Sequence, residues 1–112
     1  MTNPEFVTKL KNAIEAAFKK DPAFEKRKIE FREGETKHVS KLKSENIVVC
    51  IGESKLTSPD TQYVIHTYVP EYQLSAATYI SEAISEKIEG IMVSSDWRPD
   101  IHENLVITVV TK

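Results

Sequence analysis

The chain has 112 residues, a length typical of one domain with a single hydrophobic core. Hydrophobic residues make up 40% of it and charged residues 29%, which are ordinary values for a soluble globular protein. The net charge of −2 and the isoelectric point of about 5.9 argue against general binding of polyanions.

The charges are unevenly distributed along the chain. Residues 1–43 hold eleven Lys and Arg against seven Asp and Glu, whereas residues 44–112 hold four against ten. This asymmetry fits contact with a polyanion, or contact between the basic surface of one copy and the acidic surface of the next. Charges scattered over solvated faces are an equally good interpretation.

A single cysteine and short apolar runs indicate the compartment. Cys50 has no partner for an intramolecular disulfide, which fits a reducing environment. The apolar runs are too short to span a membrane, and the first residues lack the apolar segment of a signal peptide. We therefore expect a protein made in the cytoplasm, with no membrane partner.

The first predicted element is an amphipathic helix. Asn3-Pro4-Glu5 is a typical helix start, with a capping residue, proline at the first helical position and an acid near the positive end of the dipole. Asp21-Pro22 ends the helix. Its apolar face is formed, at steps of three and four, by Phe6, Val7, Leu10, Ala13, Ile14, Ala17 and Phe18.

Three strands should follow. Residues 27–33 alternate apolar and charged positions, as in a half-exposed edge strand. Residues 34–46 form a long polar loop. Residues 47–51 are apolar throughout and predict a strand buried on both faces, whereas 53–61 predict a turn and 62–69 an antiparallel returning strand.

The remainder predicts one helix and two strands. Pro70 should open the helix, which runs to about residues 87–89, with Gly90 just past its end. Residues 91–97 and 104–111 are the last two strands. The whole chain, 1–112, is thus expected to be one α+β domain of order α-β-β-β-α-β-β, with both helices on one face of a mostly antiparallel sheet.

His66 and Cys50 are the first candidate site residues. In 62–69 the odd positions, including Ile65, should pack under the helices, and the even positions, including His66, should lie on a half-wet face. His66 there is an interface residue, a pH-sensitive contact or a simply hydrogen-bonded strand histidine. If the strands pair in register, Cys50 and His66 are a conceivable nucleophilic pair, although no oxyanion-hole signature accompanies them. The apolar surroundings favour an inert, buried thiol with a raised pKa.

The segment 95–104 is the densest polar cluster. Its Asp96, Asp100, His102 and Glu103 are residue types that bind divalent cations, but no known ligand spacing is present, so a solvated turn is the simpler interpretation. Trp97 and Arg98 are residue types enriched in protein–protein hot spots. Alternatively, Trp97 has only a structural role, because a tryptophan beside a turn often shields the core from water.

The loop 34–46 contains the most basic patch of the chain, formed by Lys37, His38, Lys41 and Lys43. The patch lacks the aromatic residues on which bases stack, so no specific nucleic acid is expected. The chain has no phosphate-binding glycine motif and predicts no cofactor.

In the order and pattern of its elements the sequence resembles the tail terminator (tail completion) proteins of long-tailed bacteriophages. The resemblance spans nearly the whole chain. Its features are the helix "FVTKLKNAIEAAFKKDPAF", the strand "NIVVCIGE", a polar hairpin turn, the strand "TQYVIHTYVP", the helix "AATYISEAISEKI" and the strand "NLVITVVTK".

This resemblance implies a non-enzymatic α+β subunit that forms a homo-hexameric ring, terminates the tail tube and joins it to the head. The implied partners are other copies of the chain, the tail tube and the head–tail connector proteins, and the implied location is the virion tail, assembled in the host cytoplasm. Interface residues are then expected among Lys37, His38, Lys41, Lys43, His66, Trp97 and Arg98. Two other classes stay open: a small monomeric or dimeric protein that docks on and inhibits a host protein, and a small enzyme.

Overall fold

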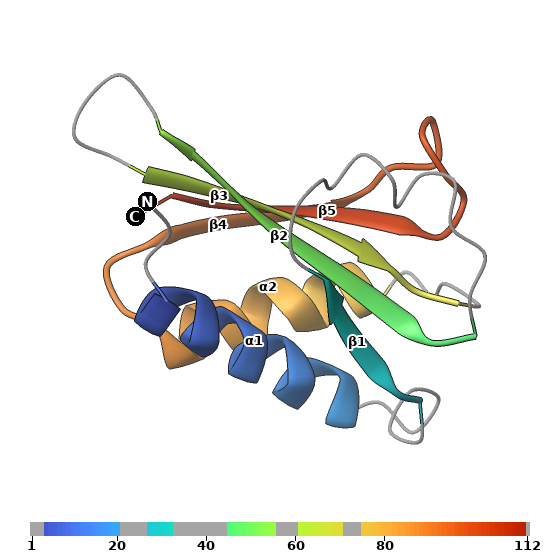
Figure 1. Cartoon of the computed structure of the whole chain (residues 1–112), viewed down its shortest axis with the longest axis horizontal. Coiled ribbons are helices and arrows are strands. Elements are labelled where there is room, and N and C mark those ends of the chain that lie inside the picture. Colours follow the sequence, from blue (N-terminus) through green and yellow to red (C-terminus); the bar gives the residue numbers. More distant parts are fainter. Residues whose placement is uncertain (1–3, 21–26, 33–44, 56–60, 71–74, 112) are drawn as a thin grey trace.

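The computed structural model describes residues 4–20, 27–32, 45–55, 61–70 and 75–111 (Figure 1). Its elements follow the chain as α1 (Pro4–Lys19), β1 (Ile29–Arg32), β2 (Ile47–Lys55), β3 (Thr61–Tyr68), α2 (Ser75–Lys87), β4 (Met92–Trp97) and β5 (Leu105–Thr111). The predicted α+β class and the predicted order of two helices and five strands are confirmed.

The five strands form one sheet in the order β1-β2-β3-β5-β4. β1 and β2 are parallel, and every other neighbouring pair is antiparallel, including the predicted pair of β2 and β3. β1 lies at one edge of the sheet, as its alternating charges predicted. β5 lies between β3 and β4, so the other edge is formed by β4.

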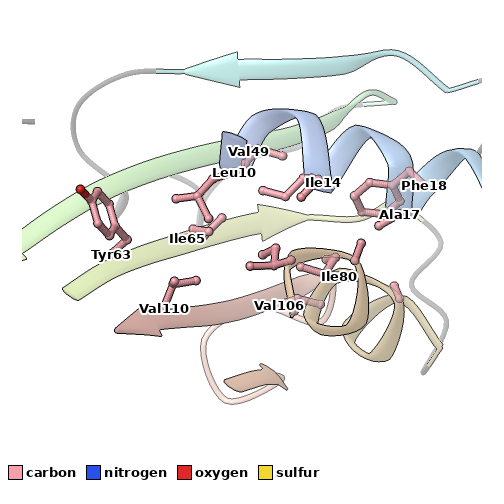
Figure 2. Packing of buried hydrophobic residues seen from close by; sticks show 14 of the residues in the cluster. Leu10, Ile14, Ala17, Phe18, Val49, Tyr63, Ile65, Ile80, Val106 and Val110 are labelled. Atoms are coloured by element: carbon pink, nitrogen blue, oxygen red, sulfur yellow. The ribbon is translucent and has the colours of Figure 1, made fainter. Parts of the chain in front are cut away.

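Both helices pack on the same face of the sheet (Figure 1). Figure 2 shows Leu10 and Ile14 of α1 and Ile80 of α2 beside Ile65 and Val106 of the sheet, and all five side chains are fully buried. Burying each of them stabilises the fold by about 1.5–3 kcal/mol relative to leaving it exposed. The apolar stripes predicted for the two helices therefore form the main core, together with the odd positions of β3.

Two predicted boundaries are wrong. Strand β2 continues to Lys55, whereas the sequence predicts a turn from residue 53, because Lys55 is still in register with Thr61 of β3. Backbone hydrogen bonds between strands form whether the side chains are polar or apolar. The polar residues at the end of β2 therefore led to the wrong prediction of a turn. Pro70 is a buried turn residue, and α2 begins at Ser75, so Pro70 does not open the helix.

Gly90 follows α2 at the position predicted for a glycine. Its φ of +75° lies in the left-handed region, where a side chain on Cβ is strained. A Cβ added there would meet no atom within 4 Å. The requirement for glycine is therefore conformational and does not come from packing.

Replacing Ile14 with Ala should lower the free energy of unfolding by about 2–5 kcal/mol, because it leaves a cavity between α1 and the sheet. Urea denaturation measures the loss. The control is Lys9→Ala on the exposed side of the same helix, which should change stability by less than about 0.5 kcal/mol. Equal effects of the two variants would contradict the packing.

Replacing Gly90 with Ala should lower the free energy of unfolding by about 1–2 kcal/mol, the cost of a left-handed residue with a Cβ. Gly90→Asn should lose less, since asparagine adopts this conformation more readily. Thermal or urea unfolding distinguishes them. A loss as large for Asn as for Ala would show that the conformation does not set the requirement.

Candidate functional site

The sheet face opposite the helices carries a second, smaller apolar cluster. Its buried members are Val48 and Cys50 of β2, Tyr68 of β3 and Leu105 of β5, with Ile107 of β5 packed against them. We call this side of the sheet the open face. The open face is less exposed to water than the sequence predicted, because β2 carries apolar side chains on both of its faces and contributes to both clusters.

A row of side chains crosses the open face from one edge of the sheet to the other. The strand registers align Arg32 of β1 with Cys50 of β2, Cys50 with His66 of β3, His66 with Ile107 of β5, and Ile107 with Asp96 of β4. Arg32 and Asp96 are exposed at the two ends of the row, and His66 is half-buried near its middle. The row thus begins at the β1 edge with a guanidinium, which donates to Glu30 of the same strand at 3.0 Å, and ends at the β4 edge with a carboxylate.

The structure brings Cys50 and His66 directly opposite each other on paired strands, as the conceivable nucleophilic pair requires. Burial of the Cys50 side chain raises the pKa of its thiol, and the Arg32 guanidinium opposes this increase only in part. A nucleophilic cysteine needs the reverse, a thiol pKa below its usual range. The electrostatics therefore favour the buried, inert thiol.

The turn between β4 and β5 is held by its own hydrogen bonds. Trp97 donates from Nε1 to the backbone oxygen of Glu103 at 2.7 Å. Arg98 donates from Nε and Nη2 to the two carboxylate oxygens of Asp100 at 2.9 and 2.7 Å. This charge-assisted hydrogen bonding lowers the pKa of Asp100 and raises that of Arg98. Trp97 and Arg98 therefore have defined orientations at the surface.

The end of this turn is hydrogen-bonded to the residue that follows β3. The backbone N–H of Asn104 donates to Nδ1 of His102 at 3.0 Å, and the Asn104 side chain donates to the backbone oxygen of Val69 at 2.9 Å. The His102 ring meets the Tyr68 ring edge-on, with 5.2 Å between their centroids. His102 thus covers one end of the open-face cluster.

The candidate metal-binding side chains of the polar segment 95–104 do not converge. Asp100 is paired with Arg98, whereas His102 is turned toward Asn104 and Tyr68. Within the described ranges, no three His, Cys, Asp or Glu side chains gather in a group that could hold a metal ion. The structure therefore favours the solvated turn.

The predicted interface residues fall in three places. Lys37, His38, Lys41 and Lys43 lie outside the described residues. His66 lies within the open face. Trp97 and Arg98 lie at the end of the β4 edge.

The sequence analysis missed two exposed apolar residues, Met92 and Ile101. Their exposed fractions are 76% and 43%, and with Trp97 at 39% they are the exposed large hydrophobic residues of the described chain. All three lie on β4 or in the turn that follows it. The periodicity of the sequence does not predict their exposure, because that exposure follows from the position of β4 at the edge of the sheet.

The raised pKa of Cys50 predicts slow alkylation of the native protein by iodoacetamide at pH 8, because both burial and a small thiolate fraction reduce the rate. The rate should increase with pH and reach that of a free thiol after unfolding in urea. Mass spectrometry follows the modification, and the urea-unfolded chain is the control. Native alkylation as fast as in the unfolded chain would contradict a buried thiol.

No helix within the described ranges is long and apolar enough to cross a membrane. Comparisons of the chain with protein-family models, with curated proteins and with solved structures find no match.

Proposed function

We propose that the chain is a non-enzymatic structural subunit of a bacteriophage tail, which forms a ring that terminates the tail tube and joins it to the head. The observation that carries the proposal is the element order α1-β1-β2-β3-α2-β4-β5, with both helices on one face of the sheet. This is the pattern through which the sequence resembles the tail terminator proteins. The proposed partners are further copies of the chain, the tail tube and the head–tail connector.

The distribution of charge supports assembly into a ring. A head-to-tail ring requires two different patches on each copy, one of which meets the other patch of the next copy. The row across the open face ends in Arg32 at one edge of the sheet and in Asp96 at the other, about as far apart as this sheet allows. Opposite charges at opposite ends favour head-to-tail contacts over contacts between like patches.

The second candidate is a small protein that docks on a host protein and inhibits it. The observation that favours it is the concentration of exposed apolar residues at one edge, with Trp97 held in place by its bond to Glu103. An oriented tryptophan beside an arginine is typical of the anchors that dominate protein–protein affinity.

The mass of the purified protein in solution distinguishes the two candidates. The ring proposal predicts a homo-oligomer of defined mass by light scattering, and closed rings in negative-stain images. The inhibitor predicts a monomer or dimer at every concentration. A strict monomer at high concentration, also in the presence of tail tubes, would contradict the ring.

A further inference from the structure

The sheet ends in two edges that differ in charge. At one edge, β1 and the two residues before it contain three basic residues and one acidic residue, Glu30. At the other, β4 and the turn to Glu103 contain three acidic residues and one basic residue, Arg98. No strand among the described residues pairs with the outer side of either edge.

Backbone groups of β4 point outward at alternate residues. The backbone N–H of Arg98 donates to the oxygen of Leu105 in β5 at 2.8 Å. In an antiparallel ladder, residues separated by two share this direction, so Asp96, Ser94 and Met92 also face β5. The N–H and C=O groups of Val93, Ser95 and Trp97 therefore face away from the sheet.

The same argument applies to β1. The backbone oxygen of Lys28 accepts a hydrogen bond from the N–H of Ile47 in β2 at 2.9 Å. Lys28, Glu30 and Arg32 therefore face β2 with their backbone groups. The backbone N–H and C=O groups of Ile29 and Phe31 therefore face away from the sheet.

β4 has few of the features that protect an edge strand from pairing. Its six residues contain one charge, Asp96, and neither lysine nor proline. It carries two of the exposed large hydrophobic residues, Met92 and Trp97. An edge of this kind is a template for an added strand.

We infer that β4 of one copy pairs with β1 of a second copy, so that the sheet continues from subunit to subunit. This inference specifies the contact for the proposed ring and rests on that proposal only in requiring that the chain self-associates. Following the pairings across the sheet, β4 runs opposite to β1. A second copy in the same orientation therefore presents its β1 antiparallel to β4 and keeps its helices on the same side.

One register, among those that the directions of the backbone groups allow, is favoured by the charges. It aligns Trp97 of one copy with Phe31 of the next, and both residues have outward backbone groups and side chains on the helix-covered face. Asp96 then meets Arg32 of the second copy on the open face, where the Arg32 guanidinium also donates to Glu30 of its own strand at 3.0 Å. Arg98 keeps Asp100 as its partner. A shift by two residues would instead place Asp96 against Glu30, and like charges directly opposite are destabilising.

Charge also argues against the two symmetric pairings. Two β4 edges would bring two acidic surfaces together, and two β1 edges would bring two basic ones together. Pairing β4 with β1 joins unlike surfaces and leaves one edge of each kind for a further copy. Such a contact closes into a ring when the rotation between copies divides a full turn.

The test exchanges the charges at the two edges. Asp96→Lys and Arg32→Glu should each weaken self-association at least tenfold, measured by sedimentation equilibrium, because each variant places like charges opposite each other where Asp96 meets Arg32. An equimolar mixture should assemble again, since positions 96 and 32 then carry opposite charges at each contact between the two variants. Glu82→Lys and Lys87→Glu are the controls, because they make the same changes of charge on exposed positions of α2. They should assemble like the unmodified chain.

Thermal unfolding shows first that both edge variants keep the fold. If one does not, Asp96→Asn and Arg32→Gln replace the pair, with a smaller expected loss. Recovery in the mixture supports the inference. Loss of assembly without recovery would indicate a symmetric edge contact and overturn it.

The outcomes separate this inference from the proposed function. Rings that are insensitive to all four charge reversals would overturn edge pairing and leave the ring standing. Open filaments that respond to the edge reversals and recover in the mixture would support edge pairing and overturn the ring. A chain that stays monomeric at high concentration would overturn both.

Discussion

The structure depends on the burial of β2 on both of its faces. Ile47 and Val49 enter the core under the helices, whereas Val48 and Cys50 enter the cluster on the open face. All four side chains are almost completely shielded from water. A strand buried in this way cannot lie at the margin of a sheet, so β1 and β3 must flank it. The short, charged β1 then becomes the edge.

The two apolar clusters determine which surfaces are left for contacts with other molecules. The helices cover one face of the sheet, and Val48, Tyr68 and Leu105 occupy much of the other. Among the described residues, no strand pairs with the outer sides of β1 and β4, and β1 pairs with only the first four residues of β2. The exposed apolar side chains of the described residues lie at or just after β4. The edges are therefore where we place the protein contacts of the proposed structural subunit.

Much of the fold is predictable because its signals are local. The helical spacing of Leu10, Ile14 and Ile80 depends only on residues a few positions apart, and each of these side chains is buried as predicted. The end of β2 at Lys55 was not predictable in this way. Its residues are polar and belong to the strand because β3 supplies the hydrogen bonds. The candidate site shows the same limit, since the residue types of 95–104 left a cation cluster open beside the simpler solvated turn, and only the structure shows that Arg98 donates to Asp100.

The sequence by itself determined the number, type and order of the elements, and it determined that Cys50 belongs to the interior, because apolar periodicity records which side of an element avoids water. Only the tertiary structure decided that β5 lies between β3 and β4, that Cys50 faces His66, and that Arg32 and Asp96 end one row at opposite edges. These relations join residues far apart in the chain. They follow from which strands pair, and pairing is set by the packing of the whole sheet against its helices.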